Sequence, residues 1–319
     1  MEARWDRRSM GCAVMPCGQG RTGRTLMFGP EYVIADGIPE KELEFLRRNI
    51  GNESGLALVE WDGQDKSALP GRLSPEKGIL ISADRELLAG MKRAGMATLQ
   101  FIGASAQRTS VSDSAAAQEG GAPDMLVEGF EDADAEFFAR VYQRAHHIPW
   151  TILETERCIV REITLDDLDD LFALYAGEGM TDYIEPLYEY EEEKEYQKAY
   201  IEHMYGFYGY GMWAVLEKAT GKLIGRAGLE HRAELDGEVE LGYAIGTPYQ
   251  KKGFATEVCG AILRYAKERL GFGRIICLIQ EGNEASEHVA KKLGFVFTDC
   301  LFLEGKYMRR YCLGGNVSD

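Results

Sequence analysis

The segment 249–257 contains residue types that could bind an anionic ligand. It reads Tyr-Gln-Lys-Lys-Gly-Phe-Ala-Thr-Glu and connects a predicted strand at 238–245 to a predicted helix. Gly253 allows the backbone to approach a ligand closely, and the free N–H groups of a helix N-terminus bind phosphate groups. Lys251 and Lys252 add positive charge within a chain whose formal net charge is -16. This local reversal of sign predicts a pyrophosphate site.

A second polar segment, Asn283-Glu-Ala-Ser286, follows a predicted strand at 274–279. Asparagine is a favoured N-cap residue, so Asn283 can begin a helix that ends at Gly294. A capping role does not exclude contact with a ligand, and both roles can hold together.

Two carboxylates in the predicted strand 238–245 are candidates for general base catalysis. Glu238 and Glu240 lie on one face of the strand because side chains alternate along it. Such a carboxylate can accept a proton directly or through a water molecule. Glu230, at the end of the preceding predicted strand, is a rival, and a glutamate that merely faces solvent is the alternative interpretation.

Apolar runs in the C-terminal half predict the elements that hold these residues. Residues 158–163 predict a strand, and Thr164 is a good N-cap for the helix that follows. The runs 212–217 and 223–229 flank a turn at 218–222 that contains a glycine, so they predict an antiparallel hairpin.

In order and spacing, these motifs resemble those of the GNAT acetyltransferases. The pyrophosphate loop of that family reads Q/R-x-x-G-x-G/A, which Gln250, Gly253 and Ala255 match. Asn283 and the Lys-Leu-Gly-Phe sequence after it match the second signature of the family at the expected distance. The similarity covers about residues 155–313 and is greatest to the ribosomal-protein N-acetyltransferase branch.

The resemblance implies the fold and the co-substrate of the C-terminal half. We expect an acetyltransferase domain at residues 151–314, with a mixed, mostly antiparallel sheet and flanking helices. Acetyl-CoA would be the co-substrate, and no metal is expected. The expected cofactor-binding residues are Ala244, Ile245, Gln250, Lys251, Lys252, Gly253, Phe254, Ala255, Thr256 and Asn283.

The resemblance also implies catalytic roles. The family often places a glutamate near the position of Glu240, so we choose Glu240 as the general base. Many relatives carry a tyrosine that protonates the departing thiolate, but Ala290 stands at that position here. Ser286 is the substitute that we expect, with solvent as the alternative.

The segment before residue 212 is rich in tyrosine and glutamate, above all at 185–201 and 205–211. The resemblance implies that this segment forms a wall of the acceptor site, where aromatic faces and carboxylates would suit a cationic amine. A solvated helix surface is the alternative interpretation. We therefore expect an N-acetyltransferase that acts on a small amine or a peptide N-terminus, and a non-catalytic acyl-CoA-binding sensor is the alternative function.

The N-terminal half predicts a smaller, Rossmann-like α/β domain at residues 31–150. The stretch 79–99 resembles the late strand and helix of the haloacid dehalogenase superfamily, which implies that Asp84 stands at a magnesium-holding position. The nucleophilic D-x-D of that superfamily is missing after the first predicted strand, and Asp132-Ala-Asp134 follows the last one. We expect a degenerate domain without phosphatase activity. Its apolar runs, typical of buried parallel strands, are 32–35, 56–59, 78–82, 97–102 and 125–127.

Two segments lack these patterns. Residues 1–30 are rich in arginine and predict a flexible tail, and residues 103–122 are rich in Ser, Ala, Gln and Gly and predict a disordered loop. Gly18-Gln-Gly-Arg-Thr-Gly23 spells G-x-G-x-x-G, but Pro16 precedes it and no helical pattern follows. A dinucleotide site is therefore not expected there.

The composition narrows the setting of the protein. A net charge of -16 and a pI near 4.9 argue against binding to nucleic acid. The seven cysteines lack C-x-x-C spacing, which favours a reducing cytoplasm. No apolar run approaches the roughly 18 residues of a membrane-spanning helix, so no membrane partner is expected. The pair His146-His147 lacks companion ligands and is expected at the surface. The sequence leaves homodimer formation open.

Overall fold

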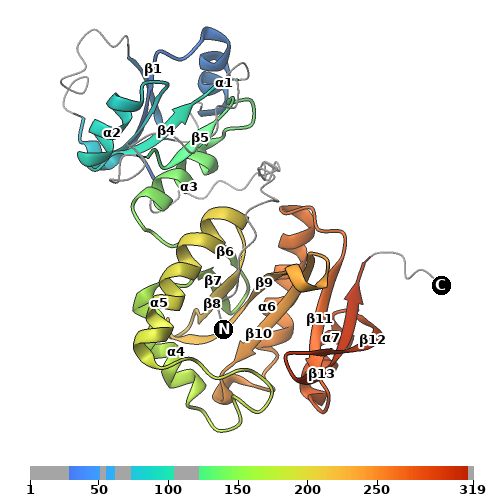
Figure 1. The fold of residues 1–319 in the computed structure, drawn as a ribbon. Coiled ribbons are helices and arrows are strands. Elements are labelled where there is room, and N and C mark those ends of the chain that lie inside the picture. Colours follow the sequence, from blue (N-terminus) through green and yellow to red (C-terminus); the bar gives the residue numbers. More distant parts are fainter. Residues whose placement is uncertain (1–28, 51–54, 62–72, 104–121, 315–319) are drawn as a thin grey trace. The chain divides into compact units, whose positions relative to one another are not determined.

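The computed structural model describes residues 29–50, 55–61, 73–103 and 122–314, apart from the side chains of Gly206 and Phe207. These residues fall into two units, one ending at Trp150 and the other beginning at Thr151 (Figure 1). Nearly all of the predicted tail and disordered loop, together with the glycine pattern near the N-terminus, lies outside the described residues.

The N-terminal unit is built on a five-stranded sheet in the order β2-β1-β3-β4-β5, and all neighbouring strands are parallel. The three central strands are buried because α1 and α3 pack on one face and α2 packs on the other. This confirms the parallel sheet that the apolar runs predict. The elements are β1 (Tyr32–Asp36), α1 (Glu40–Ile50), β2 (Ala57–Trp61), a 3-10 turn (Pro75–Lys77), β3 (Gly78–Ser82), α2 (Arg85–Arg93), β4 (Ala97–Phe101), β5 (Met125–Val127) and α3 (Ala135–Ala145).

A buried hydrogen bond joins the carboxyl ends of β1 and β3. The Ser82 hydroxyl donates to Asp36 Oδ2 at 2.7 Å and accepts from the N–H of Asp84 at 3.0 Å. Asp84 in turn caps α2, and Asp134 of the D-x-D sequence caps α3 by accepting from a backbone N–H. Both aspartates therefore have a structural role, and the resemblance to haloacid dehalogenases stays a prediction.

The C-terminal unit contains an eight-stranded sheet in the order β12-β13-β11-β10-β9-β8-β7-β6. Only β10 and β11 are parallel neighbours, so the sheet is mixed and mostly antiparallel, as the resemblance implies. The strands are β6 (Thr151–Glu154), β7 (Cys158–Glu162), β8 (Met212–Glu217), β9 (Leu223–Arg232), β10 (Glu238–Ile245), β11 (Ile275–Gln280), β12 (Val296–Leu303) and β13 (Lys306–Leu313).

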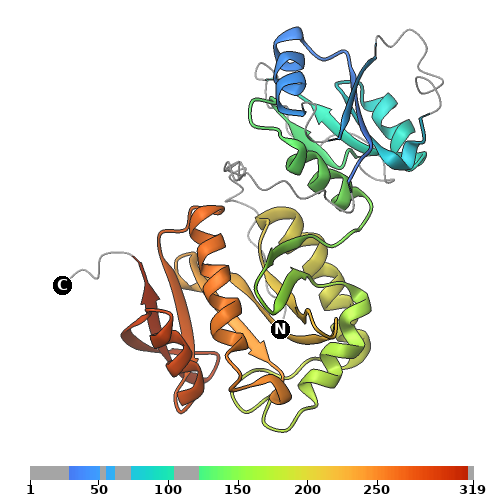
Figure 2. The same cartoon turned by 180° about the vertical axis from the view of Figure 1, so that it is seen from behind.

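Helices cover both faces of this sheet. Figure 2 shows α6 (Phe254–Glu268) in front of the sheet, with α7 (Glu284–Lys292) beside it, while α4 (Leu168–Tyr175) and α5 (Tyr190–Tyr200) lie on the other face. The chain continues from α5 directly into a π-helix, Ile201–Tyr208. The sheet therefore separates two helical layers, and a route between them needs an opening in the sheet.

The entry to α4 differs from the prediction. Thr164 begins a 3-10 turn, Leu165–Asp167, and the α-helix starts only at Leu168. The Asp167 carboxylate accepts from the Thr164 N–H at 2.7 Å and from both terminal nitrogens of Arg161 at 2.7 Å. This buried carboxylate fixes the tight first turn, because it lies at the end of the turn and bonds back to Thr164 and to Arg161 of β7.

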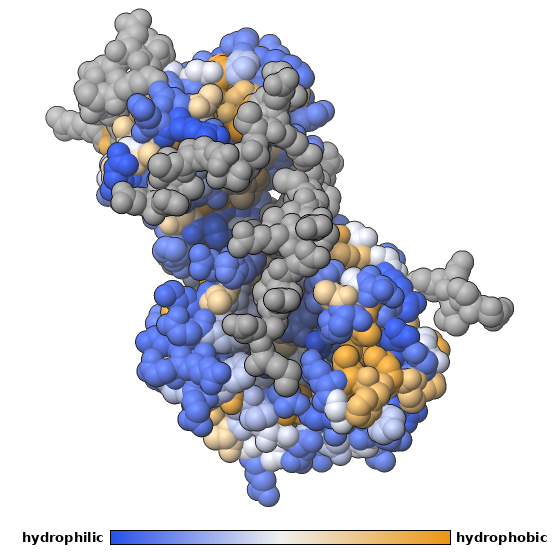
Figure 3. Space-filling view, in the orientation of Figure 1, coloured by the Kyte–Doolittle hydropathy of each residue, from blue (hydrophilic) through white to orange (hydrophobic). Residues whose placement is uncertain are grey.

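β12 forms one edge of the C-terminal sheet and exposes large apolar side chains. Val296, Phe297 and Phe302 of this strand are exposed, as is Tyr307 of β13. Figure 3 shows apolar side chains gathered over this end of the sheet. Exposed apolar side chains on an edge strand are compatible with self-association, and the homodimer stays a prediction. Among the described helices, none combines the length and apolar character that a membrane crossing requires.

Candidate functional site

The candidate site lies where the two parallel strands separate. β10 and β11 pair only at Glu240 and Ile276, although each strand pairs along its whole length with its other neighbour. Beyond this point, the Cys277 thiol lies 3.6 Å from the carbonyl oxygen of Leu241 and takes the place of a ladder bond. A pocket lined by both strands and by α7 occupies the opening, and we call it the strand-gap pocket.

The polar groups of the strand-gap pocket come from several elements. On the side of α7, the Tyr243 hydroxyl donates to Ser286 Oγ at 3.2 Å. Asn283 accepts from the Ser286 N–H at 3.1 Å and caps α7. Ala290 lines the same pocket and is buried. Two hydroxyl groups therefore lie together in the pocket, although the tyrosine that many relatives carry at Ala290 is missing.

The loop between β10 and α6 has the geometry of an anion cradle. Gly253 is the N-cap of α6 with φ of 85°, a left-handed value that favours glycine, and Lys251 is also left-handed. Glu257 is the first residue of the helix whose N–H bonds back, to the Gly253 carbonyl at 3.0 Å. The earlier N–H groups have no acceptor within the helix and are available to an anion.

Two side chains brace this loop. The Gln250 amide donates to the carbonyl of Ile245 at 2.9 Å. Arg157, from the turn before β7, donates to the carbonyl of Lys252 at 3.0 Å and pairs with Glu257 at 2.6 Å. The Arg157 guanidinium also stacks over the Phe254 ring. The loop is therefore held in shape from both ends.

The predicted cofactor residues gather at the carboxyl-terminal ends of β10 and β11. The helices α6 and α7 follow β10 and β11. Because these strands are parallel, the N-termini of both helices lie at the carboxyl-terminal ends of the two strands. Residues 244–245 end β10, 250–253 form the loop, 254–256 form the first turn of α6, and Asn283 caps α7. This arrangement of the residues is suited to an extended ligand that runs from the loop into the strand-gap pocket.

Glu240 lies at the apex of the opening and is 6% exposed. Burial raises its pKa to about 7, and the neighbouring Glu230 adds to the rise, although contacts with Arg232 and with the backbone of Leu278 lower it. A carboxylate with such a pKa is ionised in a substantial fraction at neutral pH and can still accept a proton strongly enough to act as a base.

Arg232 is the centre of an ionic cluster on the same face. Its guanidinium hydrogen bonds to Glu240 and lies 3.6 Å from carboxylate oxygens of both Glu230 and Glu234. Glu238, which the sequence places on the face of Glu240, is engaged elsewhere, because it pairs with Arg274 and Arg310. Of the two glutamates on β10, only Glu240 lines the strand-gap pocket.

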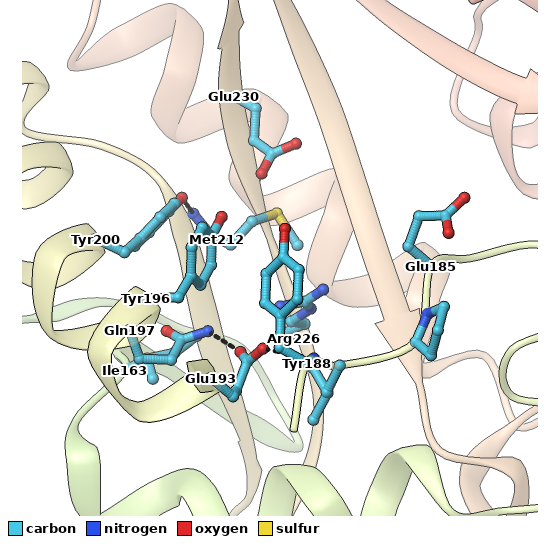
Figure 4. A pocket seen from close by; sticks show the side chains of 12 residues that line it. Ile163, Glu185, Tyr188, Glu193, Tyr196, Gln197, Tyr200, Met212, Arg226 and Glu230 are labelled. Atoms are coloured by element: carbon cyan, nitrogen blue, oxygen red, sulfur yellow. Dashed lines mark hydrogen bonds between the residues drawn. The ribbon is translucent and has the colours of Figure 1, made fainter. Parts of the chain in front are cut away.

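A second pocket lies on the side of α5, and we call it the tyrosine pocket. Its lining includes residues 185–188, four residues of α5, and Arg226 and Glu230 of β9. Figure 4 shows Glu230 at one end and Glu193 and Gln197 at the other, with the rings of Tyr196 and Tyr200 between them. The tyrosine-rich segment is therefore more than a solvated surface.

The tyrosine pocket is held by buried polar contacts. The Tyr200 hydroxyl accepts from the Met212 N–H at 2.7 Å, and Tyr205 of the π-helix bonds to the Met212 carbonyl and to the Ile163 N–H. These bonds tie the end of α5 and the π-helix to the first residue of β8. π-helices frequently occur at functional sites, because they alter the direction of side chains locally.

Sequence reasoning missed Tyr243, Arg232, Arg226 and Arg157. Strand alternation already places Tyr243 on the face opposite to Glu240, which was a usable signal. The arginines carry no motif, because their roles depend on pairing across strands and on a turn nearly 100 residues from the loop. Within the part of the chain that the structure describes, no group of three or more His, Cys, Asp or Glu residues could hold a metal ion.

Comparison with known proteins identifies relatives of the C-terminal unit. Residues 157–296 match the family model described as acetyltransferase (GNAT) domain. The Bacillus subtilis protein YoaA, described as an uncharacterized N-acetyltransferase, is 32% identical over 149 residues, which cover 45% of this chain and 82% of YoaA. YkkB of the same organism is 33% identical over 92 residues, covering 28% of this chain and 54% of YkkB.

A solved structure is also similar to this unit. The ribosomal-protein-S5-alanine acetyltransferase from Vibrio fischeri has 18% sequence identity and a TM-score of 0.45, over 52% of this chain and 97% of that protein.

Proposed function

The chain belongs to the GNAT acetyltransferase family and is an acetyl-CoA-dependent N-acetyltransferase, and on this premise we propose that it transfers the acetyl group directly to a primary amine while both substrates are bound. The observation that carries this proposal is Glu240, a buried carboxylate whose pKa of about 7 suits a base and which lies between two pockets. One pocket would hold the thioester and the other the amine.

The donor side is supported by the loop before α6. The N–H groups after Gly253 and the side chains of Lys251 and Lys252 would bind the pyrophosphate of acetyl-CoA. The pantetheine arm would then run past the ends of β10 and β11 and past Asn283 into the strand-gap pocket. Arg157 would hold the loop in shape, because it bonds to Glu257 through Nε and to the Lys252 carbonyl through Nη1.

In the reaction, the amine nitrogen attacks the thioester carbonyl carbon and Glu240 takes the proton that the amine loses. The carbon–sulfur bond breaks, and the sulfur leaves as a thiolate. The paired hydroxyls of Tyr243 and Ser286 supply the proton that converts the thiolate to free CoA, and solvent restores it. Burial raises the pKa of Tyr243 above its usual value, so this hydroxyl is protonated when the thiolate forms.

Ser286 is our candidate from the sequence, and the hydrogen bond to Tyr243 adds a second group. The position of Ala290 is filled by a small side chain, so a hydroxyl from β10 has room to reach α7. We propose that this pair replaces the tyrosine that many relatives carry. The acceptor is a small amine or a peptide N-terminus.

The test is release of free CoA thiol from acetyl-CoA, measured with polyamines, amino acids and N-terminal peptides. We expect turnover with at least one class of amine and a loss of 10²- to 10⁴-fold, about the usual contribution of a general base, in Glu240→Gln. Glu234→Gln is the matched control, because Glu234 also contacts Arg232 but lines neither pocket. Acetyl-CoA binding without turnover on any amine would overturn the proposed function, and full activity of Glu240→Gln would overturn the assignment of the base.

A further inference from the structure

Arg226 is the one cationic side chain among the residues that line the tyrosine pocket, and the described part of the chain holds no salt bridge to it. Glu185 pairs with Lys306, and Glu230 lies 3.6 Å from Arg232. Two of the three carboxylates that line the pocket are thus paired, and among the described residues no carboxylate forms an ion pair with Arg226.

The remaining carboxylate of the pocket is bound within the protein. Glu193 is 2% exposed and accepts hydrogen bonds from the Gln197 amide at 2.8 Å and the Tyr188 N–H at 3.2 Å. Arg226 is only partly exposed, and its guanidinium lies over the Tyr175 ring, 5.1 Å from the centroid. The guanidinium also interacts with the Tyr175 hydroxyl, and because a guanidinium carries five N–H donors, others are left for an anion.

Arg226 and Glu230 lie on one face of β9, four residues apart, with only Gly228 between them on that face. Their Cα atoms are therefore about 13 Å apart, at roughly 3.3 Å per residue. The backbone of Gly211 and Met212 lies directly against Gly228, and the Met212 side chain forms the pocket floor between Arg226 and Glu230 (Figure 4). The pocket thus has the Glu230 carboxylate at one end, and toward the other end it has the Arg226 guanidinium together with the internally hydrogen-bonded carboxylate of Glu193.

This separation of charges selects among amines. A polyamine would bring a second positive charge toward Arg226, which is unfavourable. In a free amino acid, the amine and carboxylate are too close together to reach both ends of the floor. In an extended peptide that lies along the floor, the Cα atoms of the first and third residues are about 7 Å apart. The side chains of the peptide and of Arg226 and Glu230 cover the remaining distance.

We propose that the acceptor is a peptide or protein N-terminus with an acidic residue at one of the positions two to four, whose carboxylate pairs with Arg226 while the α-amine lies beside Glu230 and Glu240. This inference rests on the proposed function and specifies its acceptor. The acidity of the amine agrees with this acceptor. An α-amine has an ordinary pKa near 8, which is close to the pKa of about 7 of Glu240. The side-chain amine of lysine has an ordinary pKa near 10.4 and therefore gives its proton to Glu240 less readily.

The test compares peptides that differ in one side chain. Three sets of short peptides carry Asp, Asn or Lys at the second, third or fourth position, and KM is measured for each with saturating acetyl-CoA. At one of these positions we expect the Asp peptide to have a KM at least tenfold below that of the Asn peptide, which corresponds to about 1.4 kcal/mol. Arg226→Gln should reduce this ratio to less than about twofold, and Arg226→Glu should favour the Lys peptide.

Arg264→Gln, which changes an exposed arginine of α6 outside both pockets, is the matched control and should keep the wild-type preference. Affinity for CoA serves as the measure of folding for each variant. Equal KM values for the Asp and Asn peptides at all positions in the wild type, or turnover of polyamines alone, would overturn the inference and leave the proposed function intact.

If no amine is acetylated, the proposed function fails, and binding of the same peptides to the CoA-bound protein decides the inference separately. Calorimetry should still show tighter binding of the Asp peptide in the wild type and loss of that difference in Arg226→Gln. Equal affinities in that measurement would overturn the role of Arg226.

Discussion

Glu230 and Glu240 lie directly opposite each other across the antiparallel ladder of β9 and β10. Two carboxylates in this relation repel each other, and the charge of Glu230 contributes to the raised pKa of Glu240. Glu230 lines the tyrosine pocket and Glu240 lines the strand-gap pocket, so the pair joins the two sides of the site. In the proposed reaction, an amine that enters the tyrosine pocket would meet both carboxylates before it reaches the strand-gap pocket.

The pH dependence of activity should follow Glu240. Its pKa is raised, so the carboxyl is protonated and inactive as a base at low pH, and it becomes ionised as the pH rises through about 7. We expect kcat/KM to increase through this range and to level off above it. Glu240→Gln should remove this step from the pH profile, whereas Glu234→Gln should retain it. A step that persists in Glu240→Gln would assign the titration to another group.

Arg232 should act as a positioning residue that tunes Glu240. Its positive charge and its hydrogen bond favour the ionised carboxylate and so lower the pKa of Glu240. Arg232→Gln removes both effects, and the step in the pH profile of kcat/KM should move to higher pH. Arg232→Lys keeps the charge and should recover part of the shift. A step that stays in place or moves to lower pH in Arg232→Gln would contradict this role.

Much of this site could be predicted from the sequence, for reasons that particular residues make clear. Gly253 and Asn283 are recognisable because helix N-termini and left-handed turns demand particular residue types within a few positions. The strand 238–245 coincides with β10 because its apolar run is bounded by a glycine turn and by the loop. Such local requirements are visible in a single sequence.

The partners of Glu240 required the structure. Arg232 reaches it because β9 and β10 pair in one register, and a shift of one residue would turn the arginine to the other face. The same pairing extends β9 beyond residue 229 to Arg232. The sequence does not reveal this extension, because the last residues of β9 are polar and show no apolar alternation. Arg226 has no motif, and only its lack of an ionic partner within the tyrosine pocket draws attention to it.

Tyr243 should contribute to the departure of CoA. Tyr243→Phe keeps the ring but removes the hydroxyl that bonds to Ser286, so we expect kcat to fall by roughly tenfold to a hundredfold, with little change in CoA affinity. Tyr183→Phe is the control, because Tyr183 lines the same pocket but donates its hydroxyl to the Gly282 carbonyl at 3.0 Å. Equal kcat values for wild type and Tyr243→Phe would assign the proton to Ser286 or solvent.

Gly253→Ala should weaken binding of acetyl-CoA. An alanine at φ of 85° is strained by roughly 1–2 kcal/mol, and relief of the strain would turn the N–H groups of the loop away from the pyrophosphate. Gly271→Ala is a matched control, because Gly271 has φ of 73°, open space around its Cα and a position beyond the other end of α6. Both variants should lose stability, and only Gly253→Ala should show a higher Kd for acetyl-CoA by calorimetry. Equal Kd values for acetyl-CoA in the two variants would contradict the proposal that the loop before α6 binds the pyrophosphate.

The hydrogen bond between Ser82 and Asp36 should stabilise the N-terminal unit. Both side chains are buried, and Ser82→Ala leaves a carboxylate oxygen without its 2.7 Å donor and removes the acceptor of the Asp84 N–H. An unsatisfied buried polar group costs about 1–3 kcal/mol, so denaturant unfolding of this unit should shift by that amount. Ser82 lines neither pocket of the C-terminal unit, so the Kd for acetyl-CoA should be unchanged. Asp36→Ala with Ser82→Ala should be less destabilising than the sum of the single changes, because the two groups satisfy each other. Strict additivity would mean that the hydrogen bond contributes nothing to the stability of the unit.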